Sequence, residues 1–181
     1  IATDGSTMTK TTDKVLAIER NYIQPMSAFA YTPTTPATPK PANNEIWYTA
    51  TAKVEPYYTD EFGAKYLSNV WDSETGKGVI TFEGDVTKIG YYAFYGYQTD
   101  CNKLTSVTIP DSVTTIGKMA FAHCDSLKEF KGKFAADNGR CLIMDNTIIA
   151  YANASGTTYT IPDSVTTIGD YAFYDCDSLT S

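Results

Sequence analysis

TIPDSVTTIG, residues 108–117, returns without a single change at residues 160–169, and a looser copy, TFEGDVTKIG, occupies residues 81–90. Each copy leads into a related tail, namely YYAFYG at 91–96, KMAFAH at 118–123 and DYAFYD at 170–175. Self-similarity at a fixed spacing is the signature of stacked structural units. The repeat therefore decides the architecture before any local motif is considered.

The spacing of equivalent residues gives the length of one unit. Cys101 and Cys124 are 23 residues apart, and so are Leu104 and Leu127. A wider interval, 52 residues or two periods plus six, separates Ile116 from Ile168. We therefore expect a degenerate repeat with an insertion between the two exact copies.

Each unit reads as a strand, a turn and a short helix. Leu104, Val107 and Ile109 follow the alternation of a strand with one buried face, and Pro110 ends the strand. Gly117 is expected to relieve a tight bend, and the apolar residues of the tail that follows recur at helical spacing. One coil leaves its apolar face uncovered, so coils must stack.

The sequence predicts an α/β repeat fold, a right-handed solenoid with a parallel sheet on one face and short helices or turns on the other. Stacking of equivalent side chains predicts one continuous column containing Phe94, Phe121 and Phe173.

The unit IPDSVTTIG…AF..C.SL resembles the 23-residue BspA-type leucine-rich repeat, and the resemblance covers about residues 78–181. Such repeats are common in surface proteins of Bacteroidetes and of some mucosal protists. The resemblance implies a non-catalytic adhesin at the cell surface or outside the cell. Its implied partners are host extracellular-matrix proteins, cell-surface proteins or glycans. It also implies an insert of the DNGRCLI type between regular repeats.

The rest of the chain divides by composition. Residues 1–44 read as a Pro/Thr-rich lead and linker, with a short helix over 12–20 and an extended spacer over 32–41. Residues 45–77 read as a small β-rich cap, in which Trp47 and Trp71 either pack in the core or stack on a sugar ring. Within the repeats at 78–181, the degenerate unit at 128–158 carries a hairpin over 140–151. Its turn is Asp145-Asn146, a pair that accepts positive φ. The last repeat reads as truncated, so we expect a fragment of a longer chain that self-associates through its open C-terminal coil.

Charge and hydropathy exclude several classes of partner. The chain has 181 residues, a formal net charge of −7 and 43% hydrophobic residues. Nucleic acids and anionic membranes both require a basic surface. No apolar run approaches the length of a membrane span, so direct membrane insertion is not expected.

Residues that could support catalysis or metal binding are few. His123 is the only histidine, and its neighbour Cys124 occupies a buried repeat position, so a Cys/His nucleophile is disfavoured. The four cysteines could form disulfides, but equivalent positions on adjacent coils favour free thiols. Asp125, Asp175 and Asp177 are ordinary turn residues without calcium-loop spacing. We expect no enzyme activity, no metal and no cofactor.

The outward strand residues form the predicted ligand-binding sheet face: Thr81, Thr105, Ser106, Thr108, Lys128, Glu129, Lys131, Thr158 and Thr160. Candidate glycosylation sites are Ser112, Ser126 and Ser164, each in an Asp-Ser-apolar triplet, and Asn153, in an Asn-Ala-Ser triplet. Two alternatives to a recognition module stay open. One is a structural spacer or receptor-binding fibre segment, for example of a gut bacteriophage. The other is a non-catalytic arm of a larger surface enzyme.

Overall fold

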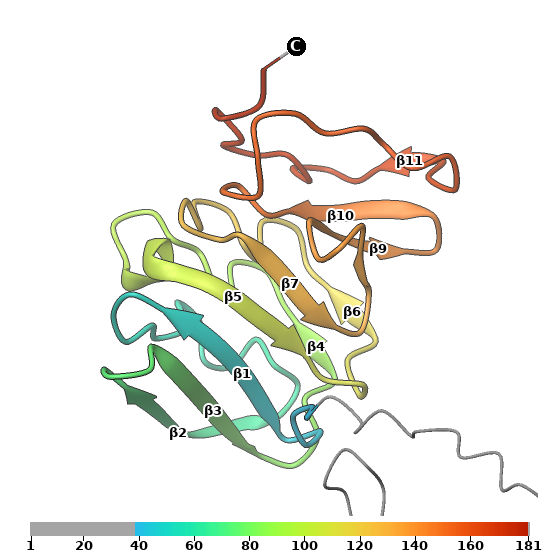
Figure 1. Cartoon of the computed structure of the whole chain (residues 1–181). Coiled ribbons are helices and arrows are strands. Elements are labelled where there is room, and N and C mark those ends of the chain that lie inside the picture. The colour runs from blue at the N-terminus through green and yellow to red at the C-terminus, as the bar shows by residue number, and fades with distance from the viewer. Residues whose placement is uncertain (1–38, 181) are drawn as a thin grey trace, which may run out of the picture. The chain divides into compact units, whose positions relative to one another are not determined.

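The computed structural model describes residues 39–180 (Figure 1). The predicted helix over 12–20 and most of the proline-rich stretch lie outside this range. No helix within it is long and apolar enough to cross a membrane. The strands are β1 (Glu45–Ala50), β2 (Lys65–Asp72), β3 (Lys77–Glu83), β4 (Lys88–Ile89), β5 (Leu104–Ile109), β6 (Thr115–Ile116), β7 (Glu129–Gly132), β8 (Ala135–Ala136), β9 (Cys141–Met144), β10 (Thr147–Tyr151) and β11 (Thr167–Ile168).

Of the short helices or turns expected after each strand, the structure has turns. The described residues contain one 3₁₀ helix, η1 (Asp100–Lys103), and no α-helix. In the tail of the second unit, Ala120 N donates to Gly117 O at 3.4 Å, which closes a single turn. Met119, with φ of 56°, and its equivalents Tyr92 and Tyr171, with φ of 57° and 63°, lie in the left-handed region. A helix cannot continue through that conformation, so each tail stays a turn.

The longest sheet is mixed, which corrects the prediction of a parallel sheet. Its strand order is β2-β3-β1-β5-β7. β5 and β7 pair in parallel, but β1 lies between β3 and β5 and is antiparallel to both (Figure 1). β1 can occupy this place because its alternating residues Ile46, Tyr48 and Ala50 all reach the core. The β-rich segment thus enters the sheet instead of lying at its end.

Parallel pairs also link successive parts of the repeat region at the two-residue strands β4, β6 and β11. β4 pairs with β6 and β10 with β11, both in parallel. The same backbone bond recurs one residue later, since Gly117 N donates to Ile89 O at 2.7 Å and Gly169 N to Ile148 O at 2.8 Å. The exact repeat TIPDSVTTIG therefore supplies the same contact in two different coils.

The apolar side chains form two clusters, so the prediction of a single phenylalanine column is wrong. Phe94 and Phe121 stack with centroids 5.5 Å apart and ring planes at 6°. Phe173 instead stacks on Tyr151 at 5.1 Å, in a separate cluster. The phenylalanine column is interrupted by the degenerate repeat, because the next ring that Phe121 contacts is Phe130 of that repeat, at a centroid distance of 5.1 Å. Between the two clusters lies the hairpin formed by β9 and β10.

That hairpin occupies the position expected from the sequence. β9 and β10 are antiparallel, with Met144 opposite Thr147. Asp145 and Asn146 have φ of 46° and 62°, as a two-residue hairpin turn requires. β8 adds to β9, so the insertion forms a small sheet of its own with β11 at its far edge.

All four cysteines are free. The buried thiols of Cys101 and Cys124 donate to backbone carbonyls, Glu55 O at 3.1 Å and Phe94 O at 3.0 Å. Burial raises the pKa of Cys101 and of Cys176 to about 12, and raises that of Cys124 well above its usual value. These thiols are therefore held in their unreactive protonated form.

We predict slow thiol labelling of the folded protein. With a pKa of about 12, Cys101 is thiolate in roughly one molecule in 10,000 at pH 8. Labelling by a maleimide, followed by mass spectrometry, should therefore be slow at all four sites and become rapid in denaturant. Fast labelling of the folded chain at Cys101 or Cys124 would contradict the buried placement.

Candidate ligand-binding sheet face

One face of the five-stranded sheet is covered by the core, and within residues 39–180 the other face carries an open groove. Strand alternation places Trp47 and Thr49 of β1 on the open face, which we call the outer face. Two cross-strand rows define it. Val79, Trp47, Thr108 and Lys131 form the first row, and Lys77, Thr49, Ser106 and Glu129 form the second. The outer face therefore joins residues of the β-rich segment with residues of the repeats.

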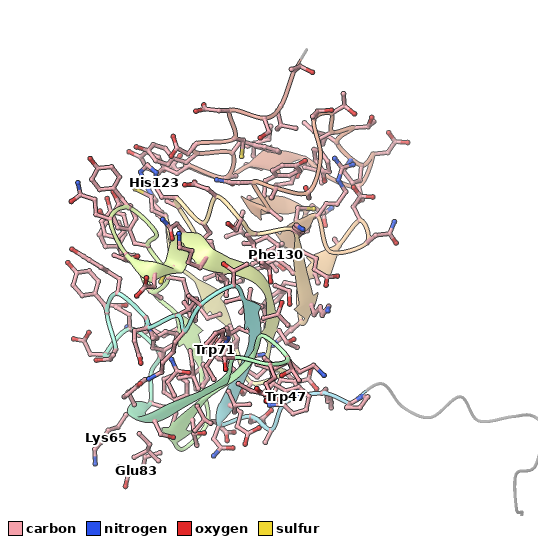
Figure 2. All side chains as sticks on the ribbon, turned by 60° about the vertical axis from the view of Figure 1, so that its left-hand side comes forward. Trp47, Lys65, Trp71, Glu83, His123 and Phe130 are labelled. Carbon is pink, nitrogen blue, oxygen red and sulfur yellow. The ribbon has the colours of Figure 1, made fainter. Side chains whose placement is uncertain are left out.

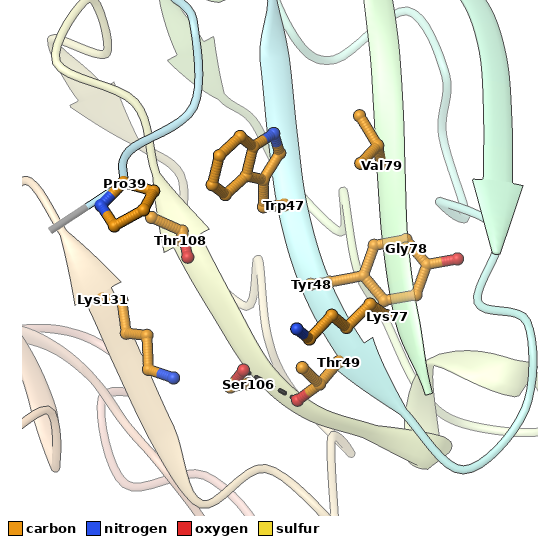
Figure 3. A pocket seen from close by; sticks show the side chains of 10 residues that line it. All are labelled: Pro39, Trp47, Tyr48, Thr49, Lys77, Gly78, Val79, Ser106, Thr108 and Lys131. Atoms are coloured by element: carbon orange, nitrogen blue, oxygen red, sulfur yellow. Dashed lines mark hydrogen bonds between the residues drawn. The ribbon is translucent and has the colours of Figure 1, made fainter. Parts of the chain in front are cut away.

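The outer face carries an open groove of about 470 Å³ (Figure 3). Figure 3 shows the Trp47 ring beside Pro39 and Thr108, with Lys131 and Lys77 on either side. The groove is lined by Pro39, Trp47, Tyr48, Thr49, Lys77, Gly78, Val79, Ser106, Thr108 and Lys131. It combines a mostly apolar wall around an aromatic ring with a few hydroxyl and ammonium groups, which is the usual composition of a ligand-binding site.

Hydrogen bonds fix the orientation of the groove side chains. Trp47 Nε1 donates to Glu45 Oε2 at 2.8 Å, which orients the indole ring. The Thr49 hydroxyl lies 2.8 Å from Ser106 Oγ and 2.7 Å from Thr105 Oγ1. Lys131 Nζ lies 2.7 Å from Glu129 Oε1. Because these groups are already ordered, a ligand would bind with a small loss of side-chain entropy.

Six of the predicted face residues lie on this outer face. Thr81 is opposite Glu45, and Thr108 is opposite both Trp47 and Lys131. Thr105 and Ser106 are consecutive, yet both contact Thr49, because the register of β1 against β5 shifts at Ala50. Such an irregularity lets two successive residues share a face. Ser106 is buried, so its hydroxyl supports the groove more than it faces solvent.

The other three predicted residues do not join the face. Lys128 is exposed but precedes β7, and it does not line the groove. Thr158 and Thr160 lie in a segment without strand structure, which corrects their assignment. Phe130 N on β7 donates to Gly139 O, so the loop before β9 takes the place that the next strand would need.

The residue that sequence reasoning undervalued is Trp47. Strand alternation within IWYTA puts Trp47 on the other side of the strand from the core residues Ile46 and Tyr48, and this signal could have placed it on the outer face. Trp71 behaves differently, since it packs against the main apolar cluster. The two tryptophans, similar in sequence context, therefore have different environments.

Two of the candidate glycosylation residues are engaged in hydrogen bonds. Asn153 is buried, its amide donates to Asp175 O at 3.3 Å, and its Oδ1 accepts from Cys176 Sγ at 3.3 Å. Ser112 Oγ donates to Val86 O at 2.8 Å. Attachment of a sugar to either would break these bonds. Ser164 is exposed and Ser126 half-buried, so at these two glycosylation stays a prediction.

One cluster has the residue types of a metal site. The ligand atoms of His123, Asp125 and Asp175 lie within 4.8 Å of one another, and His123 Nδ1 contacts the Asp175 carboxylate. Burial and the charge of Asp175 raise the pKa of Asp125. The His–Asp contact already satisfies one ligand atom of each partner, and calcium requires six or more oxygens. The cluster is therefore explained as a hydrogen-bonded link between two coils.

Comparisons with known proteins agree with the repeat seen in the strands. Residues 77–135 and 147–181 match the family described as BspA type Leucine rich repeat region (6 copies). The unmatched residues 136–146 fall on the start of the hairpin insertion. Comparison with curated proteins and with solved structures gave no match. Because the family covers more than half of the sequence, the chain belongs to the BspA-type leucine-rich repeat family.

Proposed function

We propose that this chain is a non-catalytic recognition module, located at the cell surface or outside the cell, that binds a protein or glycan through the outer face of its sheet. What supports the proposal is the groove around Trp47, where an oriented indole ring lies among hydroxyls and lysines. Host matrix proteins, cell-surface proteins and glycans all offer polar groups for Thr49 and Thr108 and acidic groups for Lys77 and Lys131. We further propose that the coils of the whole protein form a right-handed solenoid that presents this face.

A second proposal, self-association, rests on the last coil. Ile161 and Ile168 are exposed at 43% and 51%, whereas Ile109, the equivalent of Ile161, is 1% exposed. Together with Phe173 and Leu179 they line a shallow apolar depression. An apolar surface of this kind favours contact with another copy. A structural spacer or a fibre segment would use this apolar surface to join one copy of the chain to the next.

Trp47→Ala should reduce ligand capture by about 30-fold, the loss typical of a central aromatic residue at an interface. Lys131→Glu should also weaken capture, because it places a second carboxylate beside Glu129. Lys128→Glu is the matched control, since it makes the same charge change outside the groove. Capture is measured on a glycan array and on a panel of purified extracellular-matrix proteins, with the melting temperature checked for each variant.

Light scattering separates the two proposals. Equal capture by wild type, Trp47→Ala and Lys131→Glu would remove the outer face as the binding surface. A chain that captures nothing but forms oligomers at micromolar concentration would favour the spacer. A monomer whose capture depends on Trp47 would favour recognition.

A further inference from the structure

A second surface, on the turns of the coils, carries a connected group of aromatic rings that the sheet face does not use. We call it the tyrosine surface. It consists of Tyr57, Tyr58, Tyr91, Tyr92, Tyr95, Tyr97, Tyr171 and Tyr174, together with His123. Most of these residues come from the repeat tails YYAFYG and DYAFYD. Figure 2 shows His123 well separated from Trp47, so the two surfaces are distinct.

The rings contact one another from coil to coil. Tyr95 is the centre, with centroids 4.4 Å from Tyr92, 5.6 Å from Tyr57 and 5.3 Å from His123. His123 continues to Tyr174, also at 5.3 Å, and Tyr174 to Tyr171 at 5.8 Å. Each ring is thus held by its neighbours, and the surface is ordered before any partner arrives.

These rings remain open to solvent to an unusual degree. Tyr97 and Tyr171 are each 55% exposed, and Tyr91 is 50% exposed. A hydrogen bond with Tyr92 raises the pKa of Tyr91 to about 12. A contiguous exposed aromatic surface of this kind marks an interaction site, because tyrosine gives large contact area at low entropic cost.

Exposed carboxylates lie at two places along the tyrosine surface. Asp60 lies near Tyr58, and Asp125, Asp175 and Asp177 lie together beside His123. Lys118, which belongs to the tail between the two tyrosine-rich ones, is already paired with Asp170 at 2.5 Å. In residues 39–180, the cations that lie over aromatic rings, Lys133 and Arg140, lie over rings outside this surface. Within the described residues no cation lies over a ring of the tyrosine surface, so these rings offer cation–π sites beside negative charge.

We propose that the tyrosine surface binds an arginine-bearing segment of a partner protein. The guanidinium groups stack on the phenol rings around His123 and pair with the carboxylates of Asp125 and Asp177. Arginine fits better than lysine because its planar, weakly hydrated guanidinium both stacks on a ring and donates to a carboxylate. The net charge of −7 attracts such a segment at long range.

The test uses the full chain and three fluorescent peptides that differ at four positions only. These positions hold arginine, lysine or citrulline, separated by glycine and serine, and Kd is measured by anisotropy at physiological salt. We expect the arginine peptide to bind most tightly and the citrulline peptide to show no saturable binding. Tyr97→Ser with Tyr174→Ser should weaken arginine-peptide binding by about 5- to 25-fold, since two exposed cation–π contacts are lost.

Matched variants separate stacking from simple attraction. Tyr97→Phe with Tyr174→Phe keeps the rings and should retain binding, and Trp47→Ala should leave it unchanged. Equal affinity of the serine and phenylalanine double variants would overturn the proposal, as would equal binding of the arginine and citrulline peptides. Failure of the arginine peptide to bind, with saturable binding of a neutral oligosaccharide or of a second copy of the chain, would also overturn it and identify the other occupant.

Discussion

Replacement of Phe94 by alanine is expected to lower the free energy of unfolding by about 3–5 kcal/mol, the usual cost of removing a buried phenylalanine. Phe94 is 0% exposed. Its ring stacks on Phe121 at 5.5 Å and meets the edge of Phe62 at 5.6 Å. These three rings join the β-rich segment to the first and second repeats. A cavity at this point therefore weakens contacts in all three parts.

Guanidinium denaturation followed by tyrosine and tryptophan fluorescence measures this loss. Phe173→Ala is the matched control, because it removes the equivalent ring from the second cluster, where the side chain is only half-buried. Phe173→Ala should lower the free energy of unfolding by less than Phe94→Ala does. The unfolding transition of Phe173→Ala should reflect the last repeat more than the five-stranded sheet. A loss below about 1 kcal/mol for Phe94→Ala would mean that the stacked rings do not carry the core.

The period of the repeat, and the residues that face inward, could be read from the sequence because the hydrophobic pattern depends on the chain alone. Leu104, Val107 and Ile109 are buried as expected, and the Asp145-Asn146 turn forms. The position of β1 could not be read in this way. Its alternation specifies a strand, but which strand it joins depends on long-range pairing that leaves no local mark.

The choice between short helices and turns could not be made from the sequence, for a related reason. The three-to-four spacing of Ala120, Phe121 and Cys124 is the same for one helical turn and for a tight turn. The left-handed conformation of Met119 decides between them, and methionine carries no sequence signal for it. Positive φ at a residue other than glycine, asparagine or aspartate is set by the packing of the coils.

The candidate site was predictable in part. Thr108, Glu129 and Lys131 follow from strand alternation within the repeat. The groove itself requires Trp47, which comes from outside the regular repeat, and Lys77, the first residue of the family match. Both lie near Ser106 and Thr108 only because β1 pairs with β3 on one side and with β5 on the other. Sequence reasoning restricted to the repeat could therefore identify the polar face but not its aromatic centre.

Gly117→Ala is the second substitution with a large expected effect, a loss of about 2–4 kcal/mol in the free energy of unfolding. The sequence alone suggested that Gly117 relieves a tight bend, but its φ is not positive. The structural reason is close approach between coils. A Cβ atom at this position would lie 2.6 Å from the carbonyl carbon of Gly90 and 2.6 Å from Tyr91 N. Both are backbone atoms, so no side chain can rotate away.

The coils must separate to admit the methyl group, and the separation strains the bond from Gly117 N to Ile89 O, now 2.7 Å. Gly169→Ala is the matched control in the other exact copy of the repeat. There the nearest atom to an added Cβ is Ile148 O at 2.9 Å, and the coil lies at the end of the described chain. We therefore expect a smaller loss for Gly169→Ala, measured in the same denaturation experiment. If Gly117→Ala and the unchanged protein had equal stabilities, the backbone contact between repeat units would not require glycine. The presence of glycine at both position 117 and position 169 would then need a different explanation.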